Sequence, residues 1–143
     1  MPIPETLLDI RSYSGGGYLP LIDFGDWRVA VLRYSDAFMP LNLDSMERHD
    51  ETDEVFVLLA GRCTLLIGEG QERIACIHAE DMEPLKLYNV KKGCWHAAAL
   101  SPDATVLIVE NRDTTTLNSP KAMLDARQRE KIVKDVTHSW SAP

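Results

Sequence analysis

The stretch that decides the fold is Glu47–Gly61, with the sequence ERHDETDEVFVLLAG. Side chains two residues apart project from the same face of an extended strand, so Glu47 and His49 should point the same way. A short turn would then let Glu54 open the next strand beside them. We therefore expect two carboxylates and one imidazole to converge from about one hairpin.

Short apolar runs separated by turn residues continue on both sides of this stretch. Residues 19–35 hold two such runs split by Gly25-Asp26, which predicts a hairpin. Residues 55–77 hold three, which predicts a meander of three antiparallel strands joined at Gly61-Arg62 and at residues 68–70. Further runs follow at residues 85–90, 94–100 and 105–111. Many short strands at regular spacing favour a sandwich or a barrel.

A fourth potential ligand lies far along the chain, in the sequence Gly93-Cys94-Trp95-His96. His96 should begin another strand, and antiparallel closure would bring it opposite the first group. Trp95 has the opposite parity and should pack outward. Phe56 shares the parity of Glu54 and is expected in the apolar wall of a cavity.

The chain changes character at Asn118-Ser119-Pro120, because Asn or Ser can cap a helix and Pro fits its first position. A C-terminal α-helix is expected over about residues 119–137, packed on the outside of the barrel or across a subunit boundary. The strands before it place the barrel core at about residues 18–112, and the length of 143 residues fits one domain, residues 1–143.

Composition excludes several classes of partner. The net charge is −7 and the pI is about 5.0, which disfavours nucleic acid and anionic membranes as partners. Apolar runs are all shorter than the ~18 residues of a membrane span, and the first residues lack the features of a secretory signal, so a cytoplasmic location is expected. The three cysteines show no CxxC spacing and are expected to be reduced thiols.

These residues resemble the cupin superfamily, whose first motif has His-x-His, three or four residues, Glu, six residues and Gly. Glu54 and Gly61 match the second half of that motif, His49 matches its second histidine, and Glu47 stands where the first would be. The second motif, Pro-x-Gly-x-x-His with an Asn after three more residues, is matched only at Gly93 and His96.

The resemblance implies an all-β, cupin-type double-stranded β-helix, that is, a small RmlC-like jelly-roll barrel, with a C-terminal α-helix. It also implies a divalent metal ion inside the barrel, with Glu47, His49, Glu54 and His96 as its ligands. Two imidazoles with one or two carboxylates suit Fe, Mn, Ni or Zn. Glu47 is either the fourth ligand, which parity and charge favour, or a general base beside the metal.

A metal cupin of this kind is expected to bind a small polar metabolite, such as a sugar derivative or a carboxylate, as an isomerase, a lyase or an oxygenase. The alternative is a non-catalytic module that binds a small molecule in the same cavity. Small cupins often pair through sheet edges and outer faces, so a homodimer is expected, with the strand Trp27 to Leu32 as its contact.

Overall fold

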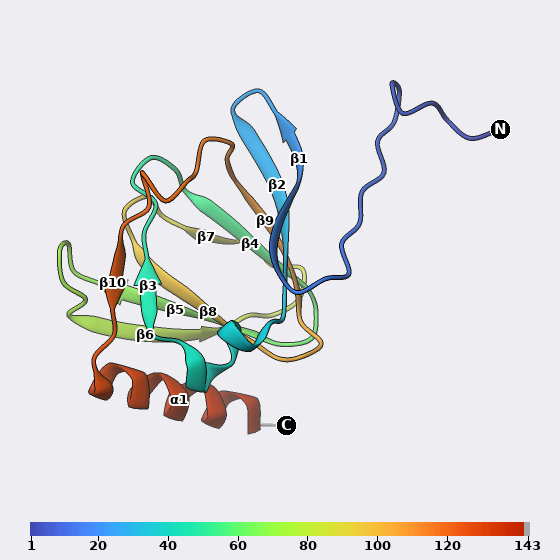
Figure 1. Cartoon of the computed structure of the whole chain (residues 1–143). Helices are drawn as coiled ribbons and strands as arrows, with labels where there is room; N and C mark the ends of the chain where they lie inside the picture. Colours follow the sequence, from blue (N-terminus) through green and yellow to red (C-terminus); the bar gives the residue numbers. More distant parts are fainter. Residues whose placement is uncertain (142–143) are drawn as a thin grey trace.

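Two five-stranded antiparallel sheets face each other, and one α-helix lies outside the second sheet (Figure 1). This is a computed structural model, and it describes residues 1–141. The first sheet has the order β1-β2-β9-β4-β7, and the second has the order β10-β3-β8-β5-β6. The elements are β1 (Gly17–Phe24), β2 (Trp27–Arg33), two 3₁₀ turns (Asp36–Phe38 and Pro40–Asn42), β3 (Ser45–Glu47), β4 (Glu54–Ala60), β5 (Cys63–Glu69), β6 (Cys76–Asp81), β7 (Tyr88–Val90), β8 (Trp95–Leu100), β9 (Thr105–Asn111), β10 (Lys121–Met123) and α1 (Ala126–Ser141).

The meander expected over residues 55–77 is correct for its second and third strands but wrong for the pairing of its first and second. β5 and β6 pair as a hairpin, but β4 pairs with β9 and β7 in the first sheet while β5 lies in the second. Gly61 turns the chain from one sheet to the other with a φ of +70°, and a Cβ there would lie 2.6 Å from the backbone of Ala104. Glycine therefore suits both the left-handed backbone and the close approach.

The space between the two sheets holds the main core. Burial alternates along β9, where Val106 and Ile108 are buried and Leu107 and Val109 are only partly covered. The buried set faces inward and packs across the barrel, as the period of two requires. Its members are Ala30, Leu32, Phe56, Leu58, Cys63, Leu65, Met82, Val90, Ala98, Leu100, Ala104, Val106 and Ile108.

A second core lies between α1 and the outer face of the second sheet. Ile132 and Val136 are the buried residues of the helix, and they pack with Trp95, which faces outward as expected from its parity. Arg62 fastens the end of α1, because its guanidinium donates to the carbonyls of Ser139 and Trp140. The helix thus lies on the exterior of the barrel and buries one face of this sheet.

The helix begins later than the expected residue 119. Residues Lys121–Met123 instead form β10, which pairs with β3. The true start is a capping box, in which the Asp125 carboxylate accepts from the amide of Gln128 at 2.8 Å and the Gln128 side chain accepts from the amide of Asp125 at 2.9 Å. Pairing with β3 overrides the capping signal at Ser119, and α1 extends to Ser141.

The hairpin expected at Gly25-Asp26 is present as β1 and β2. β2 is paired with β1 on one side and β9 on the other, so Trp27 to Leu32 has no free edge for a partner and only its outer face remains available. Within residues 1–141, no helix is both long enough and apolar enough to cross a membrane.

Candidate metal centre in the barrel

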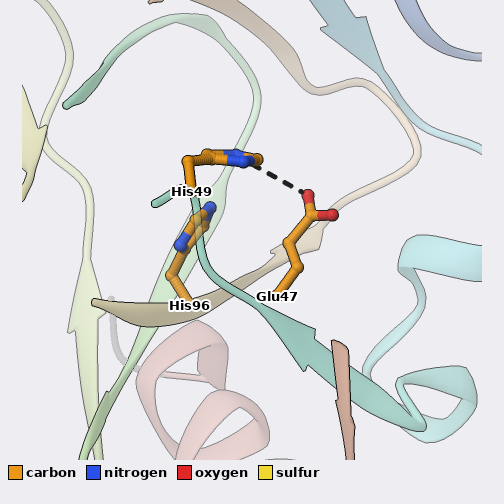
Figure 2. A group of neighbouring side chains, drawn as sticks. All are labelled: Glu47, His49 and His96. Carbon is orange, nitrogen blue, oxygen red and sulfur yellow. Dashed lines mark ion pairs between the residues drawn. The ribbon is translucent and has the colours of Figure 1, made fainter. Parts of the chain in front are cut away.

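The four expected ligands come from both sheets and meet at one end of the barrel. Glu47 lies at the end of β3, directly opposite His96 of β8 in the strand register. His49 follows β3 by two residues, and Glu54 opens β4 in the opposite sheet. Figure 2 shows the side chains of Glu47, His49 and His96 pointing toward one another. The motif spacing therefore placed all four in one neighbourhood.

Glu54 lies between the two imidazoles. Its Oε2 is 2.6 Å from His49 Nε2, and its Oε1 is 3.7 Å from His96 Nε2. Glu47 Oε1 approaches His49 Nε2 from another side at 3.9 Å. One candidate ligand atom each from Glu47, His49 and His96 lies within 4.8 Å of the other two, as a shared cation would require.

Both histidines are anchored through Nδ1. His96 Nδ1 lies 3.0 Å from the carbonyl oxygen of Cys94. A carbonyl oxygen can only accept a hydrogen bond, so Nδ1 is the donor of this contact. His49 Nδ1 lies 2.7 Å from Ser119 Oγ, and that hydroxyl in turn donates to the Asn118 side chain at 3.3 Å. Each anchor uses Nδ1, so in the neutral ring Nε2 would carry the lone pair that a metal ion binds.

Neither Nε2 has a hydrogen-bond partner of acceptable geometry among residues 1–141, although both atoms are buried. Buried polar atoms without partners are rare and indicate a missing ion, water or ligand. Neutral imidazoles fixed by an outer hydrogen bond are the usual form of histidine at a metal. The donor set therefore fits a divalent cation of the kind expected.

The sequence reasoning missed Glu110, the last buried residue of β9. Its Oε2 lies 3.9 Å from His49 Nε2, and its ligand atom lies within 4.8 Å of those of His49 and Glu54. The Tyr18 hydroxyl of β1 donates to it. Glu110 lies two residues after Ile108 and four after Val106, so all three side chains face inward. A carboxylate at an inward position of an otherwise apolar strand is the sequence feature that could have identified Glu110 as part of the site.

The two buried carboxyl groups differ in charge. Burial, together with the neighbouring Glu54 carboxylate, raises the pKa of Glu110 to about 8. Burial also acts to raise the pKa of Glu54, but the adjacent His49 and His96 outweigh it and the net pKa is lowered. For each histidine, burial lowers the pKa and the contact with Glu54 more than reverses this, so both are raised.

The loop before β4 has a structural purpose that its acidic composition did not indicate. Asp53 accepts from the amide of Lys92 at 2.8 Å and from the side chain of Asn89 at 3.0 Å. The amide of Gly93 donates to the carbonyl of His49 at 2.8 Å. These bonds hold the loop of the first motif against that of the second, and so help to hold His49, Glu54 and His96 together.

The histidines open into a cavity of about 520 Å³. Its apolar wall includes Leu32, Phe38, Phe56 and Ile108, as expected for Phe56. The rest of the lining includes hydroxyl groups, the carboxyl groups of Asp44, Glu47, Glu54 and Glu110, and one Lys side chain, Lys121 of β10. The hydroxyl groups belong to Tyr18, Ser45, Thr114, Thr115, Thr116 and Ser119.

Glu47 is more open to solvent than the other two carboxyl groups near the histidines. Its side chain is 42% exposed, whereas that of Glu54 is 7% exposed and that of Glu110 is 4% exposed. The cost of an unpaired buried carboxylate therefore applies to Glu54 and Glu110 and not to Glu47. Glu47 reaches the histidines from the mouth of the cavity.

Two other features are less suited to a functional centre. A larger hollow of about 810 Å³ runs along α1 beside Leu41, and none of its lining residues belongs to the histidine cavity. Glu69, Cys76 and His78 cluster on the β5–β6 hairpin, but all three are exposed and His78 is already paired with Glu69 at 2.8 Å. His78 is thus a surface residue.

No protein-family model matches this sequence, and no curated protein sequence does. Solved structures do match it. A variant of Streptomyces PAC13 with uridine has a TM-score of 0.55 at 6% identity, covering 80% of this chain and 84% of that one. A cupin superfamily protein from Desulfitobacterium hafniense DCB-2 has a TM-score of 0.50 at 16% identity, covering 79% and 92%. At such identities the likeness shows the fold alone.

Proposed function

Because this chain has the cupin fold, we propose that it holds a divalent metal ion at Glu47, His49, Glu54 and His96 and binds a small polar metabolite beside it. The observation that supports this most directly is the pair of buried Nε2 atoms without hydrogen-bond partners in residues 1–141. Both rings are fixed through Nδ1, so their lone pairs are directed toward a shared space without further ordering of the side chains.

A divalent metal at this position would polarise an oxygen atom of the bound molecule as a Lewis acid. The chain itself supplies the remaining recognition. Lys121 of the lining offers a cation to an anionic group such as a carboxylate, and the hydroxyl groups of the lining can donate to and accept from sugar-like oxygens. The apolar wall with Phe56 and Ile108 excludes water from the inner end. PAC13 was solved with uridine, which is also a small polar molecule with a sugar.

Metal content tests the proposal. Protein purified without chelator should contain close to one equivalent of a transition metal by elemental analysis, and His49→Ala or His96→Ala should lose most of it. His78→Ala is the matched control, because His78 is exposed and remote from the cavity lining. Wild-type metal content in both cavity variants would overturn the site.

The fourth ligand is tested separately. Glu47 and Glu110 each place an oxygen 3.9 Å from His49 Nε2, from opposite sheets. We expect Glu47→Gln to weaken metal affinity at least tenfold and Glu110→Gln to weaken it less, because Glu110 is already engaged by Tyr18. Glu47→His should retain the metal. The reverse ranking of the two Gln variants would make Glu110 the fourth ligand.

Isomerase, lyase or oxygenase activity would use this metal site, whereas a non-catalytic module requires only the cavity. Turnover of a panel of hydroxy acids, keto acids and sugar derivatives by the metal-loaded protein separates an enzyme from a binding module. If Glu47→Gln keeps full metal affinity but abolishes a measured activity, then Glu47 is a general base and not a ligand.

A further inference from the structure

The two histidines of the centre differ in the kind of atom that anchors them. His96 Nδ1 meets the carbonyl oxygen of Cys94, which can only accept a hydrogen bond. His49 Nδ1 meets the hydroxyl of Ser119, which can either accept a hydrogen bond or donate one. The anchor of His96 therefore fixes its ring tautomer alone, whereas the anchor of His49 fixes the tautomer only if the hydroxyl is itself oriented.

His49 also has the stronger opposing contact. Glu54 Oε2 lies 2.6 Å from His49 Nε2, whereas Glu54 Oε1 lies 3.7 Å from His96 Nε2. A carboxylate so close to Nε2 favours the neutral tautomer with its proton on Nε2, and a protonated Nε2 has no lone pair for a metal ion. Whatever keeps the ring proton of His49 on Nδ1 therefore keeps its Nε2 available as a ligand atom.

The backbone holds Ser119 opposite His49. Two hydrogen bonds extend the ladder of β3 and β10 past the ends of both strands, so that residues 48–50 lie beside residues 118–120. They run from the amides of Arg48 and Asp50 to the carbonyls of Pro120 and Asn118, at 3.1 Å and 3.0 Å. Ser119 is buried there, so its side chain stays on the imidazole and only the direction of its O–H bond is left to be set.

Asn118 sets that direction, because the orientation of its own amide group is fixed. Its Oδ1 accepts from the backbone amide of Thr115 at 2.9 Å. Its Nδ2 donates to the carboxylate of Glu51 at 2.9 Å and to the carbonyl of Asp113 at 3.0 Å. A backbone N–H can only donate, and carboxylate and carbonyl oxygens can only accept, so these partners allow one orientation of the Asn118 side chain.

The atom of Asn118 that faces Ser119 is therefore an acceptor. Asn118 Oδ1 lies 3.3 Å from Ser119 Oγ and takes the hydroxyl proton, which leaves the lone pairs of Oγ for His49 Nδ1–H. We propose, on the basis of the metal site proposed above, that Asn118 and Ser119 are positioning residues that keep the ring proton of His49 on Nδ1 and its Nε2 free for the metal ion. Thr115 also lines the cavity, so the loop that a bound molecule would touch orients this ligand.

Metal affinity tests the relay in the full chain. The dissociation constant for Zn²⁺, measured by competition with a chelator, should rise about 10–100-fold in Ser119→Ala and about tenfold in Asn118→Ala. Asn42→Ala is the matched control and should bind Zn²⁺ as wild type does. Asn42 also donates to a backbone carbonyl, that of Asp36 at 2.8 Å, but it is not among the residues of the described chain, 1–141, that line the cavity.

The ring tautomers of the metal-free protein give a readout that a merely structural role would not change. At a pH at which both imidazoles are neutral, ¹⁵N chemical shifts should show His96 with its proton on Nδ1 in wild type and in both variants. The share of the Nε2–H tautomer at His49 should be higher in Asn118→Ala and in Ser119→Ala than in wild type. A loss of stability alone would lower the melting temperature and leave this share unchanged.

The outcomes separate the relay from the metal site. An unchanged tautomer share at His49 in Asn118→Ala overturns the relay, and so does an unchanged Zn²⁺ affinity in Ser119→Ala. If wild type still binds Zn²⁺ through His49 in either case, the metal site stands and only the relay is removed. A wild type that binds no Zn²⁺, or a His49→Ala variant that binds it as tightly, overturns the metal site itself.

Discussion

The two sheets of this barrel carry apolar side chains on both faces but differ in what covers the outer one. In the second sheet, α1 packs over Trp95 and its neighbours and buries Ile132 and Val136. In the first sheet, Val29, Val31 and the residues in register with them are only partly covered within residues 1–141. The same strand pattern is thus covered by the chain's own helix in one sheet, and the expected homodimer would cover it in the other.

The covered face should be the more sensitive to truncation. Ile132 is 1% exposed beneath α1, so Ile132→Ala should lower the free energy of unfolding by about 2–5 kcal/mol. Urea unfolding measures this directly. Val133→Ala, on the next and only partly covered residue of the helix, should have a much smaller effect. Equal losses in the two variants would mean that α1 does not pack as described.

Metal removal should loosen the link between the two sheets. Glu54 comes from the first sheet and His96 from the second, so a bound ion would join them. At a free metal concentration of 100 times Kd, binding adds about 2.7 kcal/mol to the free energy of unfolding. A chelator should remove this contribution and so lower the melting temperature. His96→Ala should melt lower than wild type and show little further response to chelator. A wild type insensitive to chelator would contradict the proposed site.

The cap of α1 should contribute less than its buried residues. Asp125→Ala removes the acceptor for the amide of Gln128 and should lower the free energy of unfolding by about 1 kcal/mol. Asp135→Ala, which removes only the exposed pair with Lys131, is the control and should change it by about 0.3–0.5 kcal/mol. Circular dichroism during urea titration measures both. A larger loss at Asp135 would refute this ranking.

The uncovered face should be the least sensitive when the protein is dilute. Val109→Ala should lower the free energy of unfolding by less than about 1 kcal/mol in the monomer, because Val109 is only partly covered there. The effect should grow with protein concentration, since the dimer would bury this residue. Thermal unfolding at two protein concentrations measures the difference. A loss of several kcal/mol at every concentration would show that the chain itself covers this face.

Much of the fold and the site could be predicted from short stretches of sequence. The hairpin at Gly25-Asp26 and the β5–β6 pair followed from alternation and turn residues. His49, Glu54 and His96 followed from motif spacing, and the structure brings them together. The start of α1 could also have been found, since Asp125 and Gln128 have the spacing of a capping box.

The sequence by itself determined the period and spacing of the apolar runs: which side of a strand each of their residues occupies, and which ligands share a loop. These depend on contacts over a few residues. Only the tertiary structure decided that β4 pairs with β9 and not with β5, that Lys121–Met123 is a strand, and that Glu110 lies 3.9 Å from His49. The reason is that strand pairing is decided by which faces can be buried together, and residues far apart in sequence compete for the same partner.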